Sequence, residues 1–190
     1  MKVIYNNLLA YMWGTWALYW WLAARNTKRA IRKESLSSRL AYLIPLVLAA
    51  LLLWRSTFPW LYLDKRFLPA SPSVFWIGSV ITACGLLFCV WARVYLGKNW
   101  SGTVTIKEGH ELISSGPYAL VRHPIYSGLL IALCGSAVAR GEWRGVLAVG
   151  LAACSLWFKL QREEKWLSEQ FGESYAAYCQ RVAALVPFML

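Results

Sequence analysis

Residues 74–96 read VFWIGSVITACGLLFCVWARVYL, and this stretch contains no charged side chain before Arg93. A run of about 20 apolar residues is long enough to cross the hydrocarbon core of a bilayer as a helix. Apolar side chains occupy every face of such a helix rather than one stripe, which is typical of burial in lipid. The stretch therefore predicts a transmembrane helix.

Further apolar runs lie on both sides of it. The expected spans are residues 3–24, 40–54, 74–96, 125–139 and 143–160. The first is too long for the apolar part of a signal peptide, and the fourth is short for a full crossing. The RGE turn between the fourth and fifth spans predicts a helical hairpin.

Composition supports the same fold class. The 190 residues are 58% hydrophobic and have a mean hydropathy of +0.43, which leaves too little polar surface for a soluble domain. We expect an all-α integral membrane bundle of about five transmembrane helices, built as one domain over residues 1–190. Residues 1–96 form the first three spans, and residues 97–190 hold a polar loop, the last two spans and the tail.

The charge distribution predicts the orientation. Twenty Lys and Arg residues against nine Asp and Glu give a net charge of +11. These basic residues flank apolar runs, where they contact anionic lipid headgroups, so we expect membrane lipids and not nucleic acid as partners. The loops at residues 25–39 and 97–123 are both basic, which places them in the cytosol together with the tail. The amino terminus then lies outside.

Cysteine and histidine do not indicate a metal or disulfide framework. The five cysteines show no CxxC spacing, and an odd number in apolar runs is typical of small buried hydrophobes. Both histidines, His110 and His123, lie in the polar loop without cysteine or carboxylate at ligand spacing, so we predict no metal site. The sequence contains neither a P-loop motif nor a GxGxxG motif after a predicted strand. It therefore gives no indication of a soluble nucleotide-binding fold.

Two polar segments are candidates for a site. Residues 122–126, RHPIY, stand where the polar loop enters the fourth span, and Glu163 and Glu164 follow the fifth. Both segments also have a purely structural interpretation. The RHPIY segment can be an interfacial anchor with proline in the first helical turn, and the two glutamates can be solvated carboxylates beyond the span. Ionisable residues at membrane depth nevertheless often mark functional sites.

The tail beyond residue 161 predicts an amphipathic helix. Its apolar stripe consists of Leu167, Phe171, Tyr175 and Tyr178. These positions recur at helical spacing on an otherwise charged segment. Gly172 is a point where the helix can be interrupted, and we expect the stripe to rest on the protein itself or on headgroups.

The order of the polar motifs resembles that of the isoprenylcysteine carboxyl methyltransferase family. The motifs are HELI at 110–113, GPY at 116–118, RHPIYSG at 122–128, REEKWL at 162–167 and FGESY at 171–175. The resemblance covers roughly residues 97–190, whereas the first two spans match only in being hydrophobic. It implies a membrane methyltransferase that uses S-adenosyl-L-methionine, held between the cytosolic loop and the carboxyl-terminal helix.

Carried over by position, the resemblance implies a set of cofactor contacts. They are His110, Glu111, Leu112, Ile113, Tyr118, His123, Pro124, Ile125, Tyr126 and Glu163. Carboxylates and aromatic rings attract a sulfonium ion, and an adenine ring fits an apolar slot. The implied acceptor is the carboxylate of a lipophilic small molecule or prenylated substrate, which is ionised at neutral pH and needs no general base. Catalysis would come from alignment and removal of water.

One position departs from the family pattern. The family has an arginine four residues before the cofactor-binding glutamate, where it is thought to hold the acceptor carboxylate; this chain has Lys159. Lysine offers a point charge rather than a bidentate fork. Arg162 lies on nearly the same helical face and is the alternative. Lys159, Arg162 and Glu163 are therefore the predicted catalytic residues.

Three other functions remain open at the level of sequence. A phospholipid or small-lipid N-methyltransferase would need a base such as His123 or Glu164, because an amine must lose a proton before it attacks. An NADPH-dependent sterol-type reductase is similar in its last spans and tail, although Pro124 and the paired glutamates favour methyl transfer. A non-catalytic membrane scaffold would bind no cofactor.

Overall fold

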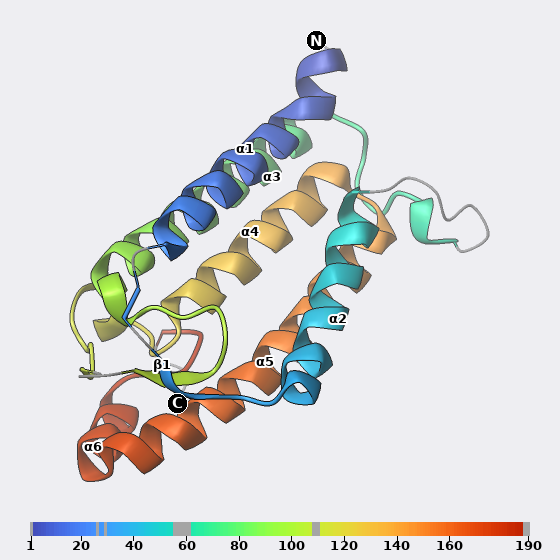
Figure 1. The fold of residues 1–190 in the computed structure, drawn as a ribbon. Coiled ribbons are helices and arrows are strands. Elements are labelled where there is room, and N and C mark those ends of the chain that lie inside the picture. The colour runs from blue at the N-terminus through green and yellow to red at the C-terminus, as the bar shows by residue number, and fades with distance from the viewer. Residues whose placement is uncertain (1, 26, 29, 55–61, 108–110, 188–190) are drawn as a thin grey trace.

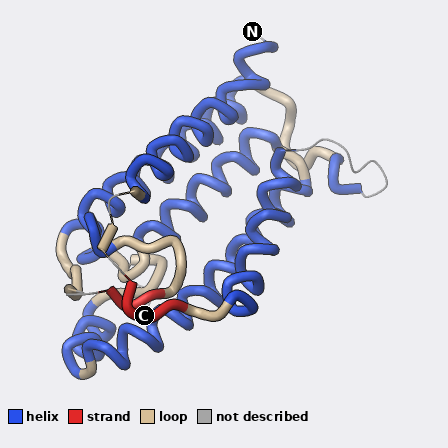
Figure 2. Tube along the Cα trace, viewed as in Figure 1, coloured by secondary structure: helices blue, strands red, loops and turns tan. Residues whose placement is uncertain are grey.

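The structure is a computed structural model that describes residues 2–25, 27–28, 30–54, 62–107 and 111–187. The helices in these ranges are α1 Lys2–Ala24, α2 Leu36–Trp54, α3 Pro72–Leu96, α4 Pro124–Arg140, α5 Trp143–Phe171 and α6 Glu173–Arg181. The long helices run side by side as a slanted bundle, with α6 and the strands together at one end (Figures 1 and 2). The predicted all-α bundle is confirmed.

Helices occupy all five of the predicted spans. By length and composition, α2, α5 and α3 with its following turn η2 (Gly97–Asn99) can cross a membrane, whereas α4 is a shorter apolar helix. Helix α1 is 23 residues long and lies beside α3. Helix α5 continues well past its expected end at residue 160, so the paired glutamates lie on the same rigid helix as the fifth span.

Helices α3 and α4 approach closely because glycines line their interface. A Cβ atom at Gly78 would lie 2.3 Å from the backbone nitrogen of Ala139, and one at Gly85 would lie 2.4 Å from that of Ala132. Small residues let helix backbones approach in membranes, where packing drives association. This contact fixes the amino-terminal end of α4 beneath the polar loop.

The remaining helices form two further contacts. Helix α2 packs on α5 through a cluster of Ala49, Leu53, Ala148 and Ala152. Helices α4 and α5 form the expected hairpin, because Gly141 adopts the left-handed conformation (φ 66°) that reverses the chain. In Figure 1, α4 lies between α1 and α2.

A small sheet at the end of the bundle that carries α6 was not predicted. Strand β1 (Ala30–Lys33) of the first loop pairs antiparallel with β2 (Thr105–Lys107) of the polar loop. The two basic loops therefore lie on the same side of the bundle, as the charge distribution predicts. The sheet ties the amino-terminal half of the chain to the loop that carries the motifs.

The tail folds back over the beginning of α4. The backbone nitrogens of Arg122 and His123 donate to the carbonyls of Ala183 and Ala184, at 2.8 and 3.0 Å. Gly172 (φ 52°) separates α5 from α6 and so divides the expected amphipathic helix into two. Loop and tail consequently meet at one end, which is the condition for a shared site.

Candidate functional site

A cavity of about 270 Å³ lies where loop and tail meet, and we call it the loop–tail cavity. Its lining includes the predicted residues Glu111, Leu112, Ile113, Tyr118, His123, Pro124, Ile125, Tyr126, Lys159 and Glu163. His110 lies outside the described residues, and Arg162 is not among the lining residues. The fold therefore gathers ten of the predicted positions around one space, although they come from three separate segments.

His123 is the centre of the polar wall. It precedes α4 directly, so Pro124 occupies the first helical turn, where a missing backbone N–H costs nothing. Its Nδ1 lies 3.6 Å from Oε2 of Glu163, and its Nε2 lies 3.3 Å from Oε1 of Glu164. Burial opposes protonation, but hydrogen bonds to both carboxylates outweigh it and raise the pKa of His123.

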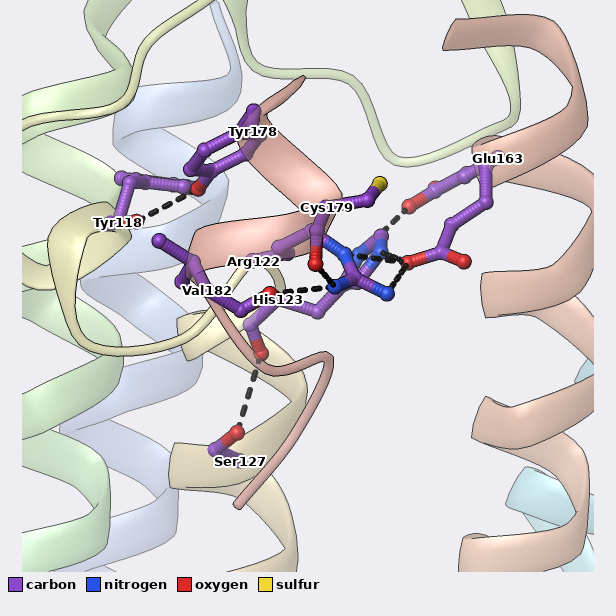
Figure 3. Close-up of polar contacts among 9 residues, drawn as sticks. Tyr118, Arg122, His123, Ser127, Glu163, Tyr178, Cys179 and Val182 are labelled. Atoms are coloured by element: carbon purple, nitrogen blue, oxygen red, sulfur yellow. Dashed lines mark hydrogen bonds and ion pairs between the residues drawn. The ribbon is translucent and has the colours of Figure 1, made fainter. Parts of the chain in front are cut away.

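Arg122 fastens the tail to α5. Its Nε and Nη2 contact Oε1 of Glu164 at 2.9 and 2.8 Å, and its Nη1 donates to the carbonyls of Cys179 and Val182 (Figure 3). Glu164 is thus held by Arg122 and His123 together. This arrangement gives Glu164 a structural role, and of the two adjacent glutamates only Glu163 lines the cavity.

Two tyrosines close the same end. Burial raises the pKa of Tyr178 to about 12, so its hydroxyl stays protonated and donates to the carbonyl of Tyr118 at 2.6 Å (Figure 3). The ring of Tyr126 stacks on His123 with centroids 5.4 Å apart and an interplanar angle of 5°. The cavity therefore has aromatic faces next to its charged groups.

Lys159 carries a positive charge into the cavity wall. Its Nζ donates to the carbonyl of Gly102 at 3.1 Å and lies 3.8 Å from Oε1 of Glu163. The same nitrogen lies 5.2 and 5.3 Å from the ring centroids of Tyr42 and Tyr126. Such cation–π contacts hold an ammonium at a desolvated position. We call Lys159, Tyr42, Gly102 and Tyr126 the lysine cage.

Arg162 points elsewhere. Its Nη1 donates to Oγ of Ser38, and its guanidinium carbon lies 4.4 Å above the ring of Phe158. Three residues along a helix leave an offset of about 60° around the axis, and the guanidinium of Arg162 contacts α2 at Ser38, one turn before Tyr42. Of the two predicted cations, the structure places only Lys159 on the cavity wall.

Several lining residues were not predicted. They include Trp16 and Trp20 of α1, Leu46 of α2, Trp100 and Asn99 of the polar loop, and Trp166 and Gln170 of α5. Trp16 and Trp20 stack with ring centroids 4.7 Å apart, and Trp20 meets Trp100 edge to face at 5.5 Å. Tryptophan is common at membrane interfaces, so its presence in the sequence carries no signal for a site.

Four buried polar atoms of the cavity wall have no hydrogen-bond partner within the described part of the chain. They are Nε1 of Trp16, Oδ1 of Asn99, Oγ1 of Thr105 and Oη of Tyr175. Buried polar atoms are nearly always paired, because an unpaired one costs about 1–3 kcal/mol. The wall thus presents a donor, an acceptor and two hydroxyls to a ligand. Among the described residues, no cluster of His, Cys, Asp and Glu could hold a metal ion.

Comparison with known proteins identifies a family and several relatives that are similar to this chain. Residues 73–174 match the family described as phospholipid methyltransferase. Protein-S-isoprenylcysteine O-methyltransferase B of Arabidopsis thaliana is 31% identical over 131 residues, which cover 65% of this chain and 66% of the relative. Its A form is 32% identical over 137 residues, covering 67% and 68%. The Schizosaccharomyces pombe enzyme of the same name is 36% identical over 104 residues, covering 52% and 43%.

These matches confirm the resemblance on which the motif assignment depends. The chain spans slightly less than two thirds of the length of the first relative, and less than half of the last. The family match begins at residue 73 and therefore includes α3, the polar loop, α4 and α5. It leaves out α1, β1 and α2, although α1 and α2 contribute to the cavity wall.

Proposed function

The chain belongs to the phospholipid methyltransferase family, and from this premise we propose that it is a membrane methyltransferase that uses S-adenosyl-L-methionine to esterify the carboxylate of a lipophilic, isoprenylcysteine-like acceptor. The observation that carries this proposal is the pair of opposite charges on one cavity wall. Glu163 and Lys159 lie 3.8 Å apart there, beside aromatic rings. One charge suits a cation and the other an anion, which are the two reactants of such a transfer.

The residues of the loop–tail cavity fit the proposed cofactor. S-adenosyl-L-methionine supplies a methyl group on a positively charged sulfur, together with an adenine, a ribose and an amino-acid end. Glu163, with the aromatic faces of Tyr118 and Tyr126, suits the sulfonium. Leu112 and Ile113 offer an apolar surface for the adenine. The unpaired polar atoms on the wall suit ribose hydroxyls and the amino-acid end, because each would gain its missing hydrogen bond.

Lys159 is the proposed holder of the acceptor. Its ammonium would pair with a carboxylate while Tyr42 and Tyr126 keep it in place. When bound, S-adenosyl-L-methionine would supply the methyl group for the new C–O bond and would leave as a neutral thioether, so an ionised acceptor would need no proton transfer. The chain's own contribution is alignment and exclusion of water, for which Arg122 and Tyr178 hold the tail over the cavity.

An apolar second cavity supports a lipophilic acceptor. It measures about 190 Å³, lies between α1, α2 and α4, and shares Trp16 with the loop–tail cavity. Its other walls include Leu9, Trp13, Ala50, Leu53 and Leu133. A hydrocarbon chain attached to the reacting carboxylate would find an apolar environment there without leaving the bundle.

N-methylation of a lipid amine is the second candidate, because the matched family is described by phospholipids. That reaction needs a base, and His123 is the imidazole that the described residues place on the cavity wall. Both of its ring nitrogens face carboxylates, which raise its pKa and favour the imidazolium form that cannot accept a proton. The geometry therefore favours a carboxylate acceptor.

We further propose that the site faces the cytosol. The two basic loops meet in the β1–β2 sheet at the same end as the cavity. Basic loops remain on the cytosolic side during insertion. A site at that end would have direct access to a soluble cofactor.

The test uses the full chain purified in detergent. Calorimetry should detect binding of S-adenosyl-L-methionine or S-adenosylhomocysteine, and NADPH should give no heat. A labelled-methyl assay should then compare farnesylcysteine, phosphatidylethanolamine and a total lipid extract. We expect a base-labile ester product, whereas a base-stable methylamine would establish the second candidate. Binding of NADPH alone would overturn methyl transfer altogether.

A further inference from the structure

Glu34 joins two segments at the entrance to the lysine cage. It lies in the first loop, between β1 and α2, and outside the family match. Its Oε2 accepts from the hydroxyl of Ser38 at 2.6 Å, and its Oε1 accepts from the hydroxyl of Tyr42 and from the backbone nitrogen of Val104 at 3.0 Å. Its own backbone nitrogen donates to the carbonyl of Val104 at 3.2 Å.

These contacts link both sides of the cage. Tyr42 belongs to α2, and its ring is one of the two that face Nζ of Lys159. Val104 belongs to the polar loop, two residues beyond Gly102, whose carbonyl accepts from the same Nζ. The backbone carbonyl of Tyr42 also accepts from Oγ of Ser155, one turn before Lys159 on α5. One carboxylate thus contacts one member of the cage, Tyr42, directly and is linked to a second, Gly102, through the nearby backbone of Val104.

Arg162 reinforces the same network from α5. It donates to the hydroxyl of Ser38, which in turn donates to Glu34. A serine hydroxyl can accept and donate at once, so the chain of contacts is fully satisfied. Through this chain a predicted catalytic residue acts on α2 rather than on a ligand.

We propose that Glu34 is a positioning residue for the acceptor: it sets the spacing of α2 and the polar loop and so aims the ammonium of Lys159 into the loop–tail cavity. The inference rests on the proposed function, in which Lys159 holds the acceptor carboxylate. A lysine side chain has four rotatable bonds and a single point charge, so its direction depends on the groups around it. Glu34 controls two of those groups without touching either reactant.

Two substitutions of Glu34 distinguish the effect of its hydrogen bonds from the effect of its charge. Glu34→Ala removes all three side-chain contacts, whereas Glu34→Gln keeps an oxygen that can accept from Tyr42 and Val104. We expect Glu34→Ala to raise the acceptor KM by about tenfold. A change of this size corresponds to about one hydrogen bond lost between the acceptor and a misplaced Lys159. Glu34→Gln should remain within about threefold of wild type, and the affinity for S-adenosylhomocysteine should change less than about twofold in both.

Glu169→Gln is the matched control. Glu169 of α5 pairs with Arg32 of β1, in the same first loop as Glu34, but both side chains are about half exposed. This variant removes a carboxylate contact from the first loop without touching the cage, and it should leave the acceptor KM unchanged. A decrease in affinity for S-adenosylhomocysteine equal to the rise in acceptor KM in Glu34→Ala would mean a general structural role and would overturn the inference.

A second readout does not depend on activity. The side chain of Lys159 is 10% exposed, so an amine-acylating reagent should modify it slowly in the wild type. Glu34→Ala should speed acylation of Lys159, measured by mass spectrometry, while exposed Lys165 on the same helix should react as before. Unchanged protection of Lys159 would refute the positioning role. Absence of methyl transfer in the wild type would instead refute the proposed function, and the two failures are distinguishable.

Discussion

The two parts of the chain contribute differently to one cavity. Residues 73–174, which match the family, supply the charged residues His123, Lys159 and Glu163. The preceding part supplies Trp16 and Trp20 to the wall and Glu34 and Tyr42 to the surroundings of Lys159. The family-matched part therefore carries the groups that would meet the reactants, and the earlier part determines the space around them. A change of acceptor between relatives would then need few changes in the motifs.

The largest expected effect tests the matched part. Glu163→Gln removes the cavity carboxylate beside Lys159 but keeps the shape of the side chain, and we expect affinity for S-adenosyl-L-methionine to fall by about a hundredfold. S-adenosylhomocysteine lacks the sulfonium charge, so its affinity should fall much less. Calorimetry on both ligands measures the difference. An equal loss for the two would show that Glu163 acts on the fold and not on the charge.

The next effect separates the two cations of α5. Lys159→Ala should raise the acceptor KM by about thirtyfold, because the acceptor carboxylate loses its counter-ion. Arg162→Gln should have a smaller effect, since Arg162 contacts Ser38 and Phe158 rather than the cavity. Steady-state kinetics with a varied acceptor provides the measurement. If Arg162→Gln had the larger effect, the assignment of Lys159 would be wrong.

A smaller effect is expected in the amino-terminal part. Trp16→Phe keeps an aromatic ring but removes the N–H that has no partner on the cavity wall. We expect a loss of affinity of about threefold for S-adenosyl-L-methionine, the cost of one neutral hydrogen bond. Trp21→Phe, at an exposed position of the same helix, is the control and should bind normally. A hundredfold loss for Trp16→Phe would place a principal ligand contact in the unmatched part and end the distinction between the two.

The same division explains what the sequence could predict. The span positions follow from long apolar runs, and the RHPIY and REE motifs follow from their order along the chain, so helices and charged site residues could be placed in advance. Glu34 is a single acid in a basic loop, and Tyr42 is one tyrosine in an apolar span. Neither has a local pattern that marks a site, because their roles arise from contacts with Val104 and Lys159 far away in sequence.

The pairing of the two short strands was not predicted, because it too depends on contacts between distant parts of the chain. Strands β1 and β2 have four and three residues, too few for a periodic signal, and they pair only because the bundle brings the two loops together. The separate directions of Lys159 and Arg162 likewise depended on where α2 and the polar loop lie. Sequence spacing placed both residues on one helix, and tertiary packing decided which one reaches the cavity.

The smallest expected effect is a pH dependence of stability, which arises from His123 in the family-matched part of the chain. Hydrogen bonds to Glu163 and Glu164 raise the pKa of His123 above its value in an unfolded chain, about 6.5, despite the opposing effect of burial. The folded protein therefore keeps a proton that the unfolded chain has released. The resulting stabilisation is complete below about pH 6.5 and is lost as the pH rises through the folded-state pKa. The apparent Tm in detergent should fall over that interval in the wild type and fall less steeply in His123→Gln. A steeper fall in the variant would mean that the imidazolium does not join α4 to α5.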